Sequence, residues 1–210
     1  MDSNFFALIS RMRYIARWGL MRNALPENIQ EHSHMVAVLA HALGVIRRDI
    51  FHQPCDVNAL ATAALYHDAS EILTGDLPTP IKYHNAEIMS AYHAVEDLAV
   101  QKLLGMLPPE LRETYADVLA EDKDGDIYPL VKAADKLSAY IKCIEERKAG
   151  NNEFLSAEAQ TRAALEASPL PEVQYFLEHF IPAFERDLDE LGAQIARDGE
   201  RARQIVEARR

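Results

Sequence analysis

Three ionisable residues, His67, Asp68 and Glu71, interrupt an otherwise apolar run, "AALYHDASEILTGDLPTPIK" at residues 63–82. Burying such side chains is costly unless they are paired or coordinate something. On a helix, His67 would lie one turn before Glu71 and Asp68 three residues before it, so all three side chains would converge on one side. The spacing therefore predicts a polar site that faces a cleft.

Two residues elsewhere offer the same kinds of side chain. In the segment 29–48, His32 shares a helical face with apolar residues such as Val36 and therefore points toward the core. In the segment 128–149, Asp135 lies close to the apolar face, although taken alone it would equally suit an exposed pairing with a neighbouring lysine. Imidazole and carboxylate ligands together suit a divalent ion such as Mn, Co, Fe, Zn or Mg. Four such ligands leave coordination positions for water and a substrate oxygen, as metal-assisted hydrolysis requires.

Helical patterning runs through nearly the whole sequence, and no segment has the alternation of a β-strand. Asn28 and Asn58 are predicted to cap helices over 29–48 and 58–74, and Gly75 to end the second. The prolines of "GDLPTPIK" predict a rigid, non-helical loop. The other predicted elements are helices over 4–17, from Asn85 to about Met106, from 108 to about Ala120 and over 128–149, a solvated turn at 121–126, and two final helices, the last kinked or interrupted at Pro182.

The chain is therefore predicted to be one all-α domain over residues 1–210. The helices around 29–48, 58–74 and 128–149 would form the metal-binding core, and the C-terminal helices over 171–209 would be peripheral. Arg17 is predicted to close the first helix, where a basic side chain complements the helix dipole.

Bulk composition narrows the range of functions. A chain of 210 residues with 49% hydrophobic and 26% charged residues is typical of a globular protein. The net charge of −11 argues against a nucleic-acid polymer as partner, whereas a few local basic residues can still bind a small anion. Cys55 and Cys143 have no CxxC spacing, and no segment suits a signal peptide or a membrane span, so a cytoplasmic location with reduced thiols is predicted.

The stretches "EHSHMVAVLAHAL", "LYHDASEILTGDLPTPIK" and "KAADKLSAYIKCIEE" resemble the H…HD…D signature of the HD-domain phosphohydrolases, and the similarity covers nearly the whole chain. The signature alone identifies only the superfamily. "RW" at 17–18, "HDASE" and "GDLPTPIK", in that order and spacing, are more specific and resemble the bacterial 5′-deoxynucleotidases. The resemblance implies a single-domain HD-domain helical bundle, a homodimer, and a Co²⁺-, Mn²⁺- or similarly metal-dependent enzyme that removes the 5′-phosphate from deoxyribonucleoside monophosphates.

Carried over by matching motif, the resemblance implies one metal ion per chain, bound by His32, His67, Asp68 and Asp135. It places Glu71 in catalysis together with His67; the sequence leaves open whether Glu71 protonates the leaving oxygen or orients the attacking water. The implied substrate contacts are Arg17 and Lys82 for the phosphate, Asp76 for the sugar 3′-hydroxyl, Trp18 for the sugar or base, and the neighbouring residues Thr79, Pro80 and Ile81.

Two alternatives stay open at this point. His84 and His93 lie between the HD pair and the last aspartate, where dinuclear HD phosphodiesterases and oxygenases recruit additional histidines, and a nucleoside triphosphate hydrolase is a related chemistry. The second alternative is a non-catalytic helical binding module, although structural metal sites are usually closed and rich in thiolates. His34 and His41 fall on other faces of their helix and are predicted to be surface or ordinary core residues. The apolar faces of the helices after position 85 are predicted to offer a dimer surface.

Overall fold

The computed structural model describes residues 3–82, 84–120 and 125–207. Within these ranges the chain forms helices and no strand, and the one β-type pairing described is an isolated bridge between Ala16 and Asn28. The all-α prediction is therefore confirmed for the described residues. In chain order the elements are α1 (Phe5–Ile9), the 3₁₀-helix η1 (Ser10–Tyr14), α2 (Ile29–Val45), the π-helical segment η2 (Ile46–Ile50), α3 (Val57–Tyr66), α4 (Glu71–Thr74), α5 (Thr79–Lys82), α6 (Ala86–Gly105), α7 (Pro109–Leu119), α8 (Tyr128–Lys148), the 3₁₀-helix η3 (Asn152–Phe154), α9 (Leu155–Glu166), α10 (Pro171–His179), α11 (Ile181–Phe184) and α12 (Leu188–Glu207).

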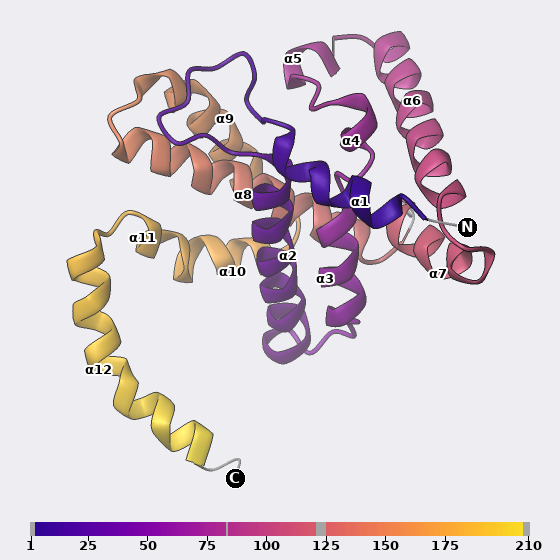
Figure 1. Ribbon diagram of the computed structural model, residues 1–210. Coiled ribbons are helices and arrows are strands. Elements are labelled where there is room, and N and C mark those ends of the chain that lie inside the picture. Colours follow the sequence, from indigo (N-terminus) through magenta and orange to yellow (C-terminus); the bar gives the residue numbers. More distant parts are fainter. Residues whose placement is uncertain (1–2, 83, 121–124, 208–210) are drawn as a thin grey trace.

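The centre of the molecule is formed by α2, α3 and α8, which pack against one another (Figure 1). Apolar side chains from the three helices interlock and are completely buried, among them Val36, Leu43, Leu60, Leu137 and Ile144. Burying one side chain of this size contributes about 2 kcal/mol to the hydrophobic stabilisation of the fold. Helices α2 and α8 and the turn that follows α3 supply the residues of the H…HD…D pattern, so the site is built on the core that holds the fold together.

Helix caps fix where two of these elements begin. Asn28 caps α2 as predicted, because its side-chain oxygen accepts hydrogen bonds from the backbone amides of Gln30 and Glu31, at 3.1 Å each. The predicted cap of α3 is wrong, since Asp56 takes the role expected of Asn58. Aspartate and asparagine are about equally good caps, and the sequence offers both within two residues. α6 begins at Ala86, one residue after the predicted start at Asn85, and the Asn85 side chain caps it.

The second predicted helix is not continuous. α3 ends at Tyr66 and α4 begins at Glu71, with a turn between them. Adjacent residues on an α-helix point about 100° apart, because the helix has 3.6 residues per turn. The turn instead lets His67 and Asp68 direct their side chains to one point, with His67 Nε2 3.2 Å from Asp68 Oδ2.

The predicted helix over 4–17 is wrong beyond Tyr14. Ile15 is extended, with φ −95° and ψ 106°, and the chain after it pairs with the residues just before α2. The backbone amide of Arg17 donates to the carbonyl of Glu27 at 3.0 Å. Arg17 therefore lies on an extended segment and not at the end of a helix, so it has no helix dipole to complement.

The segment after α4 is only partly the non-helical loop that was predicted. Gly75 ends α4 as expected, with a φ of +74° that glycine adopts without strain. The second half is helical, because α5 forms one turn whose amides donate to the Pro78 carbonyl at 2.8 and 3.0 Å. Proline is tolerated in the first turn of a helix, where its missing N–H needs no partner. The side chains of Thr79 and Pro80 lie outside the described part of the structure.

The chain after α8 forms more helices than the two predicted, namely α9 to α12. α10 ends at His179 and α11 begins at Ile181, so the interruption predicted around Pro182 is confirmed. Figure 1 shows α12 extending away from the helices around α2. Of the turn predicted at 121–126, residues 121–124 lie outside the described residues.

Candidate active site

Three parts of the core bring the H…HD…D residues together. His32 lies in the first turn of α2, His67 and Asp68 in the turn after α3, and Asp135 in α8. His32, His67 and Asp135 each offer one ligand atom within 4.8 Å of the other two. His32 Nε2 lies 3.1 Å from Asp135 Oδ1, and Asp68 Oδ2 lies 3.5 Å from His32 Nε2 and 3.2 Å from His67 Nε2. The four side chains therefore converge on one small volume, which we call the HD cluster.

The imidazole nitrogens that face the HD cluster have no hydrogen-bond partner among the described residues. Nε2 of His32 and Nε2 of His67 are both buried, and their contacts with the carboxylates lack hydrogen-bond geometry. The opposite nitrogens are engaged, since His67 Nδ1 lies 2.8 Å from the Ala64 carbonyl and His32 Nδ1 lies 3.2 Å from Ser138 Oγ. The Nδ1 proton that donates to a carbonyl leaves Nε2 of His67 facing the carboxylates, and loss of the proton from Nε2 gives the form that binds a metal. These donors fit a divalent cation.

The two carboxylates of the HD cluster are held in the ionised form. Burial alone would raise the pKa of Asp68, but the neighbouring His67, His32 and Arg17 hold it well below its usual range. Burial likewise opposes ionisation of Asp135, and His32 and His67 hold the pKa of that carboxyl below its usual range as well. Ionised carboxylates are what binding of a divalent cation requires.

Glu71 lies next to the HD cluster in the opposite state. It is the first residue of α4 and is 6% exposed, and its Oε2 has no hydrogen-bond partner in the described residues. Burial and the negative charges of Asp68 and Asp76 raise the pKa of Glu71 to about 9. A carboxyl group that keeps its proton at neutral pH can act as a proton donor. Asp68, which favours the ionised form, and Glu71, which favours the protonated form, are therefore only three residues apart.

Arg17 and Trp18 lie on the extended segment that leads into the loop before α2. Arg17 Nη1 is 3.3 Å from Asp68 Oδ2, so its guanidinium lies at the edge of the HD cluster. Its Nε donates to Glu27 Oε2 at 3.0 Å, and Trp18 Nε1 donates to the same oxygen at 3.0 Å. The indole also packs on Phe154, with 5.2 Å between ring centres. The structure therefore brings Arg17 beside the predicted metal ligand Asp68, and Trp18 is held by the same Glu27 oxygen as Arg17.

Asp76 belongs to the same charged region. It follows Gly75 and is half-buried. Burial raises the pKa of Asp76, and the guanidinium of Arg17 and the backbone N–H of Trp18 oppose the rise. Asp76 is therefore a neighbour of the two residues with which it was predicted to bind the substrate.

Lys82 contacts α6. Its Nζ lies 3.0 Å from Glu96 Oε1 and 4.6 Å from the centre of the Tyr92 ring. Its charge still acts on Glu71, because it opposes the rise in the pKa of that carboxyl. Ile81, on the same short helix, is 45% exposed.

Other histidines stay outside the HD cluster in the described structure. His93 Nδ1 is 2.9 Å from Glu96 Oε2, and His84 is exposed. His34 and His41 are exposed too, as predicted for residues on other faces of α2. The described residues therefore give no support to a dinuclear centre that includes His84 or His93.

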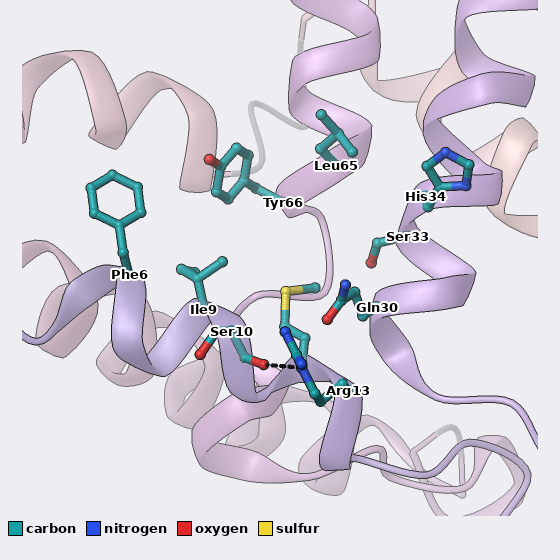
Figure 2. A pocket seen from close by; sticks show the side chains of 10 residues that line it. Phe6, Ile9, Ser10, Arg13, Gln30, Ser33, His34, Leu65 and Tyr66 are labelled. Atoms are coloured by element: carbon teal, nitrogen blue, oxygen red, sulfur yellow. Dashed lines mark hydrogen bonds between the residues drawn. The ribbon is translucent and has the colours of Figure 1, made fainter.

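A separate groove of about 370 Å³ lies beside α1, η1, α2 and α3. Figure 2 shows Arg13, Gln30 and Ser33 around it, together with the rings of Phe6 and Tyr66. None of the predicted site residues is among the described residues that line it. The groove is therefore distinct from the candidate active site.

Two residues that shape the site were not predicted from the sequence. Ser138 follows Asp135 by three residues and so shares its face of α8, a spacing that identifies it in retrospect. Glu27 leaves no such signal, because its contacts with Arg17 and Trp18 depend on the chain folding back through a loop, and helical periodicity does not report on loops.

The fold and the HD cluster together define the HD-domain phosphohydrolase class. The HD-domain phosphohydrolase of Listeria innocua superposes with a TM-score of 0.76, covers 93% of this chain and 98% of that chain, and is 25% identical. The HD phosphohydrolase DatZ of cyanophage S-2L, solved with dA and one catalytic Zn²⁺ ion, has a TM-score of 0.58, covers 89% of this chain and all of that chain, and is 24% identical. The predicted HD-domain fold is confirmed.

Sequence comparison narrows the class to a family. The family model of the YfbR-like 5′-deoxynucleotidases matches residues 4–184. The 5′-deoxynucleotidases YfbR of Shigella boydii and of Escherichia coli are both 50% identical over 191 residues, which cover 90% of this chain and 96% of each relative. The chain belongs to the YfbR-like 5′-deoxynucleotidase family. The matched range ends before α12, and among the described helices none has the length and apolar character needed to cross a membrane.

Proposed function

We propose that this chain is a metal-dependent 5′-deoxynucleotidase that hydrolyses deoxyribonucleoside 5′-monophosphates to deoxyribonucleosides and phosphate. One observation carries the proposal: among the described residues, the buried Nε2 atoms of His32 and His67 have no hydrogen-bond partner and face two ionised carboxylates, Asp68 and Asp135. Membership of the family, and relatives at 50% identity that carry the name 5′-deoxynucleotidase, support the substrate class.

In this proposal the four residues of the HD cluster hold one divalent ion per chain, Co²⁺, Mn²⁺ or a similar ion. The ion, when bound, neutralises negative charge on the phosphoryl group and activates a water molecule. Imidazole and carboxylate ligands without a thiolate favour such borderline or hard ions. DatZ binds a catalytic Zn²⁺ ion, which is consistent with a divalent ion in the same fold.

Hydrolysis forms a bond between phosphorus and a water oxygen and breaks the bond to the sugar 5′ oxygen, which must gain a proton. Glu71 is protonated at neutral pH and its backbone amide donates to the Asp68 carbonyl at 3.0 Å, so it lies directly beside a proposed metal ligand. We therefore assign the proton to Glu71, in preference to a role in orienting the water. Glu71 regains a proton as the attacking water gives one up, so protons balance over the reaction.

Substrate binding falls to the two segments beside the HD cluster. In the described structure the contacts of Arg17 engage Nε and Nη1, so we assign Nη2 to a phosphate oxygen. Asp76 accepts a hydrogen bond from the sugar 3′-hydroxyl, and Trp18 forms a wall against the sugar or base. Lys82 leaves Glu96 to reach the phosphate. The neighbouring Thr79, Pro80 and Ile81 are proposed as further substrate contacts. Ribonucleotides are disfavoured because this wall offers the 2′-hydroxyl neither space nor a partner.

The assembly and location are proposed from the surface of α6 and from the state of the cysteines. A homodimer is consistent with the apolar surface of α6, where Val95 and Leu98 are 50% and 49% exposed. A cytoplasmic location is consistent with Cys55 and Cys143, which are both free thiols. No nucleic-acid polymer or membrane is proposed as a partner.

Phosphate release from a panel of nucleotides tests the proposed function. The panel contains deoxy- and ribonucleoside 5′-monophosphates and a deoxynucleoside triphosphate, each with Mn²⁺, Co²⁺ and Mg²⁺. We expect release from the deoxynucleoside monophosphates and far slower release from the others. Release from the triphosphate in preference, or no release with any metal, would contradict the proposal.

A further inference from the structure

One carboxylate oxygen holds both side chains of the RW pair. Glu27 Oε2 accepts hydrogen bonds from Arg17 Nε and from Trp18 Nε1, each at 3.0 Å. The backbone carbonyl of Glu27 also accepts from the amide of Arg17 at 3.0 Å. The Glu27 side chain is only 15% exposed, so these charge-assisted bonds are little weakened by water.

The backbone explains why two adjacent residues reach the same oxygen. Successive side chains of an extended segment point to opposite sides. Trp18 has a φ of +59°, in the left-handed region, so the alternation does not continue through it, and a turn follows in which the amide of Met21 donates to the Trp18 carbonyl at 2.9 Å. The indole is then held from two directions, by Glu27 at its nitrogen and by Phe154 at its ring.

Arg17 forms ion pairs with two carboxylates, Asp68 inside the HD cluster and Glu27 outside it. Asp68 is a proposed metal ligand and lies 3.3 Å from Nη1, whereas Glu27 takes no part in the HD cluster. Without Glu27, Asp68 is the one ion-pair partner that Arg17 keeps among the described residues. The guanidinium would then move toward the metal ligand and away from the phosphate.

We propose that Glu27 is a positioning residue that fixes Arg17 against the phosphate and Trp18 against the nucleoside. This inference rests on the proposed function, since it names the residue that orients the substrate contacts of that site. Glu27 itself touches no reacting atom, and it acts through the two side chains that it holds.

A double-mutant cycle tests the inference through activity. Glu27→Gln is expected to lower kcat/KM for deoxyadenosine 5′-monophosphate by about tenfold to a hundredfold, because the uncharged amide no longer fixes the guanidinium. In an Arg17→Ala background the same substitution is expected to cost several-fold less than in the unmodified protein, because only the bond to Trp18 is left to lose and residues that act as a unit are not additive. If the two losses multiply instead, Glu27 does not act through Arg17 and the inference is overturned.

Tryptophan emission gives a second measurement that needs no turnover, because Trp18 is the only tryptophan in the chain. Glu27→Gln is expected to shift the emission, and to weaken binding of deoxyadenosine 5′-monophosphate about tenfold when titrated in a Glu71→Ala background. Glu27→Asp keeps the charge but shortens the side chain by one methylene. If Glu27→Gln does not fold, Glu27→Asp is expected to give the same shift in emission and the same loss of nucleotide binding. Emission and binding that are unchanged in both variants would overturn the inference.

The matched control is Glu158→Gln. Glu158 also pairs with an arginine, Arg147, and is 16% exposed, but it lies on α9. The Glu158→Gln variant should leave kcat/KM and Trp18 emission unchanged. A loss of kcat/KM equal to that of Glu27→Gln would show that removing any such carboxylate has this effect, and would overturn the inference. Absence of phosphate release by the unmodified protein would contradict the proposed function instead, and the emission of Trp18 would still decide whether Glu27 holds the indole.

Discussion

The two segments that carry the proposed substrate contacts are anchored to the protein in different ways. The segment 17–27 is tied to α8 by Glu146, which is completely buried. The Glu146 carboxylate accepts hydrogen bonds from the backbone amides of Ala24 and Leu25, at 2.8 and 3.0 Å, and forms an ion pair with the buried Lys142. In this anchor both oxygens of a buried carboxylate accept hydrogen bonds.

The segment 75–82 has no comparable anchor among its described contacts. The ion pair described for it joins Lys82 to Glu96, and both side chains are 21% exposed. Its helix, α5, is a single turn. An ion pair that water reaches contributes about 0–1 kcal/mol, whereas breaking a buried pair costs several times more.

The difference indicates a division of labour between the two segments. If Arg17 and Trp18 bind the substrate as proposed, the first segment holds them in one geometry before the substrate arrives, which avoids an ordering cost on binding. In the same proposal, Lys82 on the second segment exchanges its partly exposed pair with Glu96 for a phosphate.

Asp68→Ala is expected to have the largest effect. It removes a proposed metal ligand and one partner of Arg17, so we expect loss of bound metal and activity at the detection limit. Metal analysis of the purified protein, together with phosphate release, measures both. A variant that keeps one metal per chain would show that Asp68 is not a ligand.

Glu71→Gln is expected to lower kcat by roughly 10²–10⁴-fold while the metal stays bound. The group acts when protonated, so activity should fall as the pH rises through its pKa, which burial and the charges of Asp68 and Asp76 raise. The pH profile of kcat is the measurement. The basic limb should be missing in the variant, and a near-native kcat would remove Glu71 from the mechanism.

Glu146→Gln breaks the anchor of the first segment. It leaves Lys142 buried without its charged partner, so we expect the free energy of unfolding to fall by about 3–5 kcal/mol. We also expect kcat/KM to fall about tenfold, because Arg17 and Trp18 lose their support. Denaturant unfolding measures the first effect. Glu145→Gln, at an exposed neighbouring carboxylate, is the control and should change neither quantity.

The same carboxylate predicts how stability depends on pH. Although burial opposes its ionisation, Lys142 and the amides of Leu25, Ala24 and Asn151 hold the pKa of Glu146 at about 2. A carboxyl whose pKa is lower when folded contributes stability that is complete above the unfolded pKa and is lost as the pH falls. The contribution should therefore disappear between about pH 5 and pH 2, and unfolding of Glu146→Gln should lack this component.

Glu96→Gln is expected to have the smallest effect. The free energy of unfolding should change by less than about 1 kcal/mol, because the pair with Lys82 is partly exposed. We expect KM to stay the same or to fall a few-fold, since Lys82 is released toward the phosphate. A loss of activity as large as that of Glu146→Gln would contradict the contrast between the segments. Asp97→Asn, at an exposed neighbour, is the control.

The long helices could be predicted from the sequence because their apolar periodicity reflects burial. α6 and α8 begin and end within one or two residues of the expected positions. Periodicity failed where chain geometry is set by contacts between distant segments. The extended stretch at Arg17 exists because it pairs with Glu27, and no local pattern encodes that partner.

The candidate site shows the same limit. The spacing of His67, Asp68 and Glu71 predicted that they would meet, but on a continuous helix. The structure brings them together through a turn, because adjacent helical positions diverge. Glu27 and Glu146 escaped notice for a related reason: their partners lie in loops, and the role of a buried carboxylate follows from its partners and not from its position in a pattern.

The central claim is that one divalent ion, held by the HD cluster, is required for hydrolysis of a deoxynucleoside monophosphate. The most direct measurement titrates metal-free protein with Co²⁺ or Mn²⁺ while following phosphate release from deoxyadenosine 5′-monophosphate. We predict that the rate rises with added metal and saturates at one equivalent per chain. Activity without metal, or saturation only at two equivalents, would contradict the account.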